Sequence, residues 1–350
     1  MVRRRSTASW DESDARSRPP RRGTRPRTKD RPAHRDALTG WVTTVDRGRY
    51  TCLVPAPEHT DGRTADAPPD ALEVTAMRAR ALRPGDVAVG DRVGLVGDTS
   101  GGENSLARLV RVEERTSALR RSADDTDPVE RVVVANADQV CLVVAAADPQ
   151  PNPRLVDRAL VAAWDAGVDP LLVVTKTDLA DPVDLVTAYS DLGLRVLGVS
   201  REGWCGLDAV RGALAGRVTA LVGPSGVGKS TLVNELSPGA YRAVSTVSET
   251  TGKGRHTSTS AIVLPLATGG WAVDTPGIRS FGLAHVGPDE LLRAFPDLAD
   301  GTDECPRGCS HDEEECGLDA WVAAGHSSPA RLESYRRLLG ALRAAAETYD

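Results

Sequence analysis

The stretch GPSGVGKS at residues 223–230 limits the possible folds of this chain more than any other. It stands between the apolar run RVTALV and the helix-like STLVNEL, which predicts a buried strand that passes through a glycine loop into a helix. Gly223, Gly226 and Gly228 let backbone N–H groups approach phosphate oxygens. Lys229 can reach the outer phosphates, and the Ser230 hydroxyl can bind Mg²⁺. The stretch therefore predicts a phosphate-binding loop.

The segments around this loop predict a doubly wound parallel α/β sheet. From Arg131 onward, apolar runs typical of buried strands alternate with stretches of helical periodicity. The runs are QVCLVVAAA, PLLVVTKTDL and LRVLGVS, and the helical stretches are RLVDRALVAAWDAG and GLDAVRGAL. A further strand ends in WAVDTPG, where Asp274 could hold magnesium through water and the Gly277 N–H could sense a terminal phosphate.

The motif TKTD, Thr175 to Asp178, ends one of these strands and predicts a reader of guanine. A carboxylate at Asp178 can accept hydrogen bonds from N1–H and the 2-amino group of guanine, which adenine does not offer there. The Lys176 stem can cover the base, and Thr175 stands where GTPases most often carry Asn. In GVSREG, Ser200 follows another strand and could complete the base pocket through backbone N–H groups, or it could belong to a plain loop.

The order of the motifs is that of a circularly permuted GTPase. The base reader precedes the phosphate loop and WAVDTPG comes last, whereas ordinary GTPases run from P-loop through switch and DTPG to base reader. A sheet keeps its strand neighbours when old termini are joined and another connection is cut. The second switch then leads directly into the C-terminal segment, so nucleotide state could be transmitted to it.

The polar stretch GKGRHTSTS supplies candidates for the first switch. Thr257 is the first candidate for the magnesium ligand and Thr259 the alternative, unless the stretch is an ordinary exposed loop. His256 could position the attacking water, or it could face solvent. Ile278 stands just beyond DTPG, where many GTPases carry a water-orienting Gln, so intrinsic turnover should be slow and a partner should accelerate it.

Four residues near the C-terminus predict a metal site. Cys305, Cys309, His311 and Cys316 have the spacing C-x3-C-x-H-x4-C, which can form a closed tetrahedral shell for structural Zn²⁺. The helix-like stretches LDAWVAAG and PARLESYRRLLGALRAAAE follow. A domain this small and polar needs additional stabilisation, which a bound metal ion would give. The alternative is an incidental patch of reactive thiols.

The N-terminal third predicts a basic arm and a small barrel. Residues 1–35 contain twelve Arg or Lys against four Asp or Glu, in a chain of net charge −6. The arm is expected to be disordered and to dock on polyanions, unless it only aids solubility. From Asp36, five or so short strands ending near LARLVRVEERTSALRR favour an OB-fold that binds nucleic acid through its backbone, or else a protein-binding module.

From about Asp36 onward the chain resembles the circularly permuted bacterial ribosome small-subunit-dependent GTPase A family. GPSGVGKS, GKGRHTST, DTPGIRSFGL and the Cys/Cys/His/Cys cluster all look like motifs of that family, in its order. The resemblance implies a late-acting maturation factor that binds the small ribosomal subunit and its rRNA, hydrolyses GTP to GDP there, and leaves. It also implies residue roles. By analogy, the nucleotide would be bound by Thr175, Lys176, Thr177, Asp178, Gly223, Pro224, Ser225, Gly226, Val227, Gly228, Lys229, Ser230 and Thr231.

These expectations give a domain plan and a cellular setting. We expect a basic arm over 1–35, an OB-fold over 36–120, the permuted GTPase domain over 121–285 and a zinc-binding helical domain over 286–350. No apolar run approaches the roughly 20 residues that span a bilayer, and the N-terminus does not read as a secretory signal. A cytoplasmic monomer without membrane contact is expected. Two alternatives are a nucleic-acid-binding assembly module with a merely structural nucleotide, and a P-loop ATPase or kinase, which Asp178 disfavours.

Overall fold

The computed structural model describes residues 34–56, 68, 70–122, 130–190, 192–238, 261–275, 287–293, 295–313 and 315–346. The chain divides into two compact units, 1–35 and 36–350, and the elements below belong to the second. The basic arm, apart from its last two residues, lies outside the described residues, as do the first predicted switch segment and the second one beyond Thr275. In the described part, no helix is long and apolar enough to cross a membrane.

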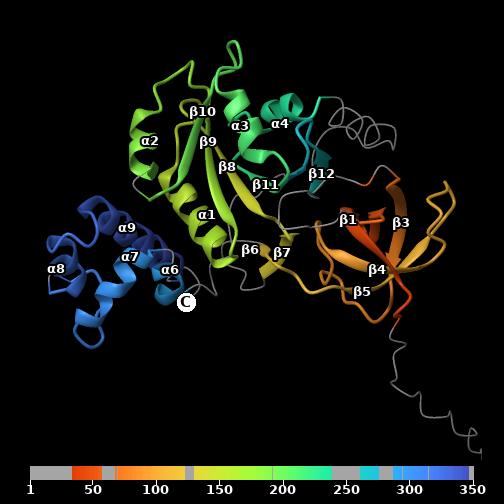
Figure 1. The fold of residues 1–350 in the computed structure, drawn as a ribbon, viewed down its shortest axis with the longest axis horizontal. Helices are drawn as coiled ribbons and strands as arrows, with labels where there is room; N and C mark the ends of the chain where they lie inside the picture. The colour runs from red at the N-terminus through yellow and green to blue at the C-terminus, as the bar shows by residue number, and fades with distance from the viewer. Residues whose placement is uncertain are drawn as a thin grey trace, which may run out of the picture. The chain divides into compact units, whose positions relative to one another are not determined.

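A five-stranded barrel opens the second unit, as the sequence predicted (Figure 1). Its strands are β1 (Leu38–Asp46), β2 (Arg49–Val54), β3 (Leu72–Arg78), β4 (Arg92–Gly97) and β5 (Ala107–Val112). β1 pairs with β2 and β4, β2 with β3, and β5 with β4, all antiparallel, while β3 and β5 pair in parallel and complete the ring. Alternate apolar side chains fill the interior, among them Val42, Cys52, Val74 and Leu109, because successive residues of a strand face opposite sides.

The GTPase-type sheet follows the barrel in the chain. Its strands are β8 (Gln139–Ala145), β9 (Asp169–Thr175), β10 (Arg195–Val199), β11 (Val218–Val222), β12 (Ile262–Pro265) and β13 (Trp271–Asp274). The order across the sheet is β10-β9-β8-β11-β13-β12, with every neighbouring pair parallel except β12 and β13. This is the predicted doubly wound sheet, with an added antiparallel strand.

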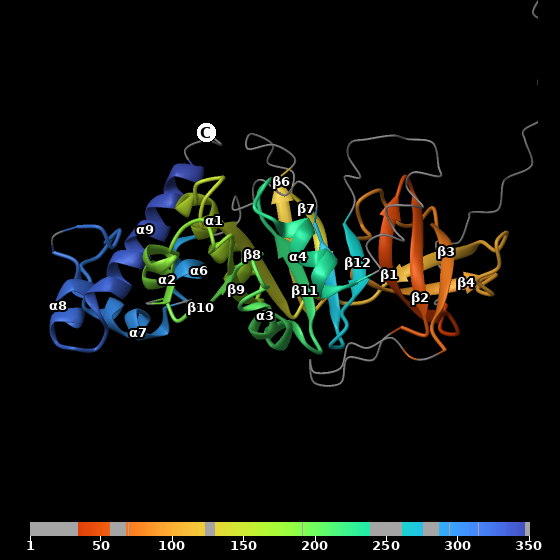
Figure 2. The same cartoon turned by 90° about the horizontal axis from the view of Figure 1, so that it is seen from above.

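Helices cover both faces of this sheet (Figures 1 and 2). They are α1 (Pro153–Asp165), α2 (Val183–Ser190), α3 (Leu207–Leu214) and α4 (Lys229–Leu236). Along β8, Val140, Leu142 and Val144 pack in one core with residues of α1 and α2. Cys141 and Val143 pack in a second core with residues of α3 and α4. A strand buried on both faces must be apolar throughout, which explains the unbroken run in the sequence.

A separate two-stranded sheet follows the barrel, whose last strand lies within the stretch LARLVRVEERTSALRR, near which the sequence predicted the barrel to end. β6 (Ala118–Ser122) pairs with β7 (Glu130–Ala135), while the barrel's own last strand ends at Val112. Leu119 and Val134 are buried in the same core as α1, so this small sheet packs with the GTPase-type sheet. Its outer residues include Arg120 and Arg131.

The C-terminal part is helical, as the sequence predicted. It comprises α6 (Pro288–Leu292), α7 (Pro296–Ala299), the short 3₁₀ helix η2 (Asp300–Glu304), α8 (Gly317–Ala323) and α9 (Pro329–Ala346). Phe295, Leu298, Leu318 and Tyr335 are buried together, in one core with residues of α1. α9 therefore packs on the same face of the sheet that α1 covers.

Gly90 lies just before β4, where β1 of the barrel meets the end of the small sheet. Its φ is +89°, and its carbonyl accepts hydrogen bonds from Trp41 Nε1 at 3.0 Å and Asn136 Nδ2 at 2.9 Å. A Cβ atom there would lie 2.0 Å from the Ala135 carbonyl oxygen. Only glycine fits, because both the backbone conformation and the close approach exclude a side chain.

We expect Gly90→Ala to lower the free energy of unfolding by at least about 3 kcal/mol, since strained backbone and overpacking add. The matched control is Gly48→Ala in the β1–β2 turn, where φ is +84° and nothing lies within 4 Å of the added atom. That change should cost about 1–2 kcal/mol. Urea unfolding measures both, and equal losses would show that the Gly90 contacts do not matter.

Candidate nucleotide site and Cys/His cluster

The phosphate loop lies at the carboxyl end of β11, as predicted. Gly228 has φ +88° and is the N-cap of α4, so the loop turns directly into the helix N-terminus. A Cβ on Gly223 would lie 2.4 Å from the Val143 carbonyl oxygen, so the loop can run this close to β8 only with glycine there. Ser225, Ser230 and Thr231 are exposed around this turn. Free N–H groups at a helix start and the helix dipole together favour an anion here.

Lys229 and Asp274 form an ion pair beside this loop. The Lys229 ammonium donates to Asp274 Oδ1, and the two side chains are only 10% and 5% exposed. Asp274 ends β13, which is parallel to β11, so both residues reach the same edge of the sheet. The sequence assigned Lys229 to phosphate and Asp274 to magnesium. In the structure each neutralises the other.

The base reader lies two strands away along the same edge. Asp178 follows β9, and its Oδ1 accepts from the Ser200 hydroxyl at 3.0 Å and from the Arg201 N–H at 3.2 Å. Its own backbone N–H, the Ser200 hydroxyl and the Arg201 N–H lower the pKa of the Asp178 carboxyl. The group is thus an oriented, ionised acceptor at neutral pH. Ser200, predicted to offer its N–H to the base, instead positions the carboxylate with its side chain.

Thr175 joins the base reader to the phosphate loop. Its hydroxyl donates to the carbonyl oxygen of Val227 in the loop, with the Val144 carbonyl oxygen at 3.1 Å as a second acceptor. Thr175 is buried, so this contact is shielded from water. The position where Asn is usual in GTPases therefore keeps a tether, made here by a threonine hydroxyl.

The loop over residues 146–152, between β8 and α1, borders both halves of the site and was not predicted. The Lys176 ammonium donates to the Asp148 carbonyl oxygen, and the Ala146 N–H donates to the Thr175 carbonyl at 2.8 Å. Pro149 Cδ lies 3.6 Å from where a Cβ on Gly226 would be. No sequence motif marks this loop. Its position follows from β8 lying between β9 and β11.

Four predicted nucleotide-site residues have no described geometry. His256 and Thr257, together with the alternative Thr259, lie outside the described residues, as does Gly277 after β13. Of the remaining predicted residues, Thr177 is half-buried at the end of β9, with its N–H 3.4 Å from the Val199 carbonyl oxygen, and Pro224 is half-buried in the loop.

The four predicted metal ligands come together. One ligand atom from each of Cys305, Cys309, His311 and Cys316 lies within 4.8 Å of all the others. Cys305 Sγ is 3.5 Å from His311 Nδ1 and 3.9 Å from Cys316 Sγ. A tetrahedral Zn²⁺ site has S···N and S···S edges of about 3.6 and 3.8 Å, given its usual bond lengths. Size and donor set therefore fit zinc.

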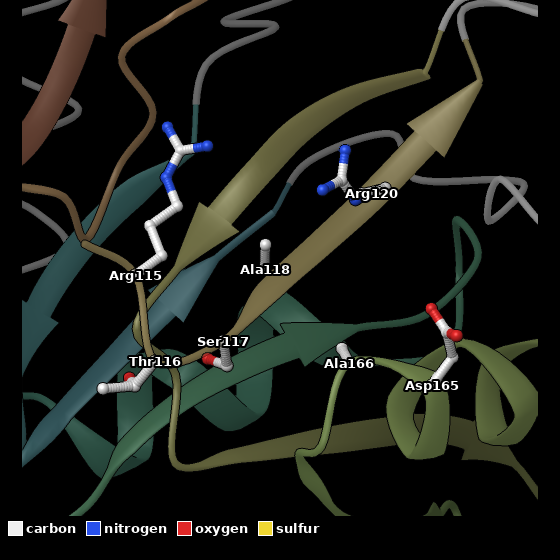
Figure 3. A pocket seen from close by; sticks show the side chains of 7 residues that line it. All are labelled: Arg115, Thr116, Ser117, Ala118, Arg120, Asp165 and Ala166. Atoms are coloured by element: carbon white, nitrogen blue, oxygen red, sulfur yellow. The ribbon is translucent and has the colours of Figure 1, made fainter. Parts of the chain in front are cut away.

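A groove away from these residues is bordered by two arginines and one aspartate among small and uncharged residues. It has a volume of about 600 Å³ and is bordered by Arg115, Thr116, Ser117, Ala118, Arg120, Asp165 and Ala166. Figure 3 shows Arg115 before β6 and Arg120 on it, with Asp165 and Ala166 at the end of α1. Arg115 is already bound to the buried Asp91 carboxylate, at 2.6 and 2.7 Å. Sequence reasoning did not find this groove, because it depends on how the small sheet packs.

Base reader, phosphate loop and Asp274 thus share one sheet edge in permuted chain order, which defines a circularly permuted P-loop GTPase. Residues 112–284 match the family model described as RsgA GTPase. A Pseudomonas aeruginosa protein named small ribosomal subunit biogenesis GTPase RsgA is 39% identical over 69% of this chain and 73% of its own. The Gemmatimonas aurantiaca protein of that name is 39% identical over 72% and 83%. The chain belongs to the RsgA GTPase family.

Solved structures agree with this assignment. YjeQ from Thermotoga maritima superposes with a TM-score of 0.62 at 27% identity, over 87% of this chain and 98% of YjeQ. YloQ, described as a circularly permuted GTPase, superposes with a TM-score of 0.60 over 90% and 98%, and at 23% identity this likeness concerns the fold alone.

We expect Asp178→Asn to weaken GTP binding by at least about 2 kcal/mol, roughly thirtyfold, because an amide donor replaces an ionised acceptor facing guanine donors. Preference should shift toward xanthosine nucleotides. The matched control is Ser200→Ala, which keeps the carboxylate, so it should weaken GTP only modestly and leave the preference for GTP over XTP unchanged. Titration with both nucleotides decides, and an unaltered GTP/XTP ratio in Asp178→Asn would reject Asp178 as the base reader.

Proposed function

We propose that this GTPase binds the small ribosomal subunit, acts in its late maturation, and hydrolyses GTP to GDP and phosphate when the subunit stimulates it. The observation that carries the proposal is the joining of base reader and phosphate loop at one sheet edge through Thr175 and Val227. The names of the Pseudomonas and Gemmatimonas relatives point to the small ribosomal subunit as the particle on which this GTPase acts. The exposed arginines of the small sheet, Arg120 and Arg131, and the barrel would give surfaces on which RNA can dock.

In this proposal the nucleotide is bound by the segments Thr175 to Asp178 and Gly223 to Thr231. Asp178 accepts from guanine, Lys176 covers the base, and the loop N–H groups take the phosphates. Lys229 would turn from Asp274 to the outer phosphates, and Asp274 and the Ser230 hydroxyl would hold the Mg²⁺, which would neutralise phosphate charge. The residues present fit this exchange, because an ammonium and a carboxylate already face each other at the loop.

The proposed switch residues act on the terminal phosphate. Thr257 would bind Mg²⁺, the Gly277 N–H would sense the phosphate, and His256 would help position water. Ile278 cannot hydrogen-bond water, so the free protein should hydrolyse GTP slowly. A docked subunit that holds these residues at the terminal phosphate would then start hydrolysis, and product release would return the factor to solution.

RNA contact is assigned to the barrel, the small sheet and the basic arm. Arg120 and Arg131 are exposed on the small sheet, and Arg121 is paired directly across from Arg131. Like charges opposite each other destabilise a strand pair, and a phosphate backbone relieves the repulsion. Phosphate contact positions a protein without reading sequence, which suits a factor that recognises a folded particle.

The Cys/His cluster is proposed to hold one structural Zn²⁺ through Cys305, Cys309, His311 and Cys316. With four protein ligands, zinc would leave no place for a reactive water. Its role would be to hold the segment between η2 and α8, where the chain has little else to bury. We further propose the division into 36–120, 121–285 and 286–350 as functional parts of a cytoplasmic monomer.

We expect small ribosomal subunits to raise GTP turnover at least tenfold, which corresponds to roughly 1.4 kcal/mol of barrier. Phosphate release from GTP and from ATP, with and without purified subunits, measures this, and ATP should give no stimulated rate. Lys229→Ala should abolish both GTP rates, because the phosphates lose a direct contact. The GTP form should bind subunits more tightly than the GDP form.

A second variant separates docking from chemistry. Arg120→Gln/Arg131→Gln should raise the subunit concentration needed for half-maximal stimulation and reduce the salt dependence of binding, while the free protein keeps its slow rate.

If subunits leave turnover of the wild type unchanged, the chain is an assembly module that carries a structural nucleotide. If His256→Ala keeps the full stimulated rate, His256 has no catalytic role.

Purified full-length protein should contain about one zinc per chain when prepared under reducing conditions without chelator. Cys309→Ser should lose the metal and loosen the C-terminal helices, because three ligands do not complete the shell. Elemental analysis and circular dichroism measure the two effects. Cys205→Ser, an exposed cysteine outside the cluster, is the matched control and should keep its zinc. Metal-free wild-type protein would refute the site.

A further inference from the structure

Three consecutive residues of α9 connect the Cys/His cluster to the nucleotide-binding part of the chain. We call Tyr335, Arg336 and Arg337 the 335–337 segment. Successive helical residues point in directions about 100° apart, so three in a row can reach two different neighbours. One neighbour is the loop that carries His311, and the other is α1.

On the cluster side, the segment holds one of the proposed metal ligands. The Tyr335 ring packs edge-on against the His311 ring, with centroids 6.1 Å apart. Arg336 Nε donates to the His311 carbonyl oxygen at 2.9 Å, and its two terminal nitrogens bind the Asp319 carboxylate at 3.0 and 2.6 Å. Ring and backbone of His311 are therefore both fixed to α9.

On the other side, Arg337 reaches a buried carboxylate of α1. Arg337 Nε lies 3.1 Å from Asp157 Oδ2, and the guanidinium stacks 5.4 Å from the centre of the Tyr189 ring. The Tyr189 hydroxyl, from α2, donates to Asp157 Oδ1 at 3.0 Å. Asp157 is 2% exposed, so Arg337 is its counter-charge. A buried charge that loses its partner is strongly unfavourable, which ties α9 to α1.

Aromatic packing adds a second connection between the same two helices. Tyr335 packs edge-on against Phe295 at 5.4 Å, and Phe295 packs edge-on against Trp164 of α1 at 5.7 Å. All these contacts lie in one continuous core. The side chains therefore form an unbroken packed path from His311 to α1.

α1 in turn begins at the loop that borders the nucleotide site. The Tyr189 hydroxyl also lies 3.2 Å from the carbonyl oxygen of Pro153, the first residue of α1. The loop just before Pro153 accepts a hydrogen bond from Lys176 at the Asp148 carbonyl oxygen, and its Pro149 lies beside Gly226 of the phosphate loop, with Cδ 3.6 Å from where a Cβ on Gly226 would be. A shift of α1 thus moves a wall of the nucleotide pocket.

We infer that the 335–337 segment makes the Cys/His cluster and the nucleotide pocket interdependent, so that a metal ion in the cluster strengthens nucleotide binding. The inference rests on the proposed metal site. A filled cluster fixes His311, His311 fixes the segment, and the segment holds α1 and its loop in place. Binding linkage is reciprocal, so bound nucleotide must strengthen metal binding by the same free energy that the metal adds to nucleotide binding.

The test compares zinc-loaded and chelator-stripped full-length protein in their affinity for a fluorescent GDP analogue. Stripping should weaken GDP binding about fivefold in the wild type. Arg337→Gln removes the counter-charge of Asp157 and should bring the loaded-to-stripped ratio close to one. Glu333→Gln, an exposed residue of the same helix, is the matched control and should keep the wild-type ratio.

A second measurement keeps the inference testable if Arg337→Gln folds poorly. In competition with a coloured chelator, the wild type should keep a larger share of its zinc at equilibrium with GDP than without it. Asp157→Asn, which removes the need for a counter-charge, should reduce that difference. Wild-type protein that takes up no zinc overturns the metal site and the coupling together. Zinc-loaded and stripped protein with equal GDP affinity overturns the coupling alone.

Discussion

The pairing of β8 with β9 on one side and β11 on the other is the constraint on which the nucleotide site depends. Backbone hydrogen bonds in both ladders set the register, so the base reader after β9 and the phosphate loop after β11 end at one edge of the sheet. The Thr175 hydroxyl then joins the two through Val227. This geometry comes from strand neighbours and not from chain order, so a permuted chain can build it as well as an unpermuted one.

The ion pairs Lys229–Asp274 and Arg337–Asp157 each bury a carboxylate, but the first is suited to exchange partners and the second to hold two helices together. Lys229 and Asp274 face a sheet edge where phosphate can take over the lysine and Mg²⁺ the carboxylate, so the pair is suited to exchange. Asp157 is surrounded by α1, α2 and α9, and Arg337 is its counter-charge. Removing one partner of a buried pair costs about 3–5 kcal/mol. Because the Arg337 side chain is 37% exposed, the cost here is at or below the lower end of that range. It still makes separation of α9 from α1 unfavourable.

Much of the fold could be predicted because local patterns report burial directly. The unbroken apolar run of β8 is that of a strand covered on both faces. Positive φ at Arg47 and Gly48 forms the tight β1–β2 turn, in which glycine is a favoured residue. The small sheet was harder. Its strands follow the barrel without a break in composition, and only the burial of Leu119 and Val134 beside α1 shows that they do not belong to the barrel. α2 is short and half-buried, so its periodicity is weak, and it was not predicted.

The candidate site also has features that the sequence predicted and contacts that only the tertiary structure shows. The glycine loop, TKTD and the cysteine spacing could be recognised from the chain as candidate sites, because phosphate, guanine and zinc each demand particular atoms at short sequence separation. Contacts between distant segments could not be read. Examples are the hydrogen bonds from Thr175 to Val227, from Ser200 to Asp178 and from Lys176 to the Asp148 carbonyl oxygen. Another is the series of aromatic contacts that runs from His311 to α1. Each depends on strand register and helix packing, which arise from the sum of many weak contacts across the chain and leave no local mark in the sequence.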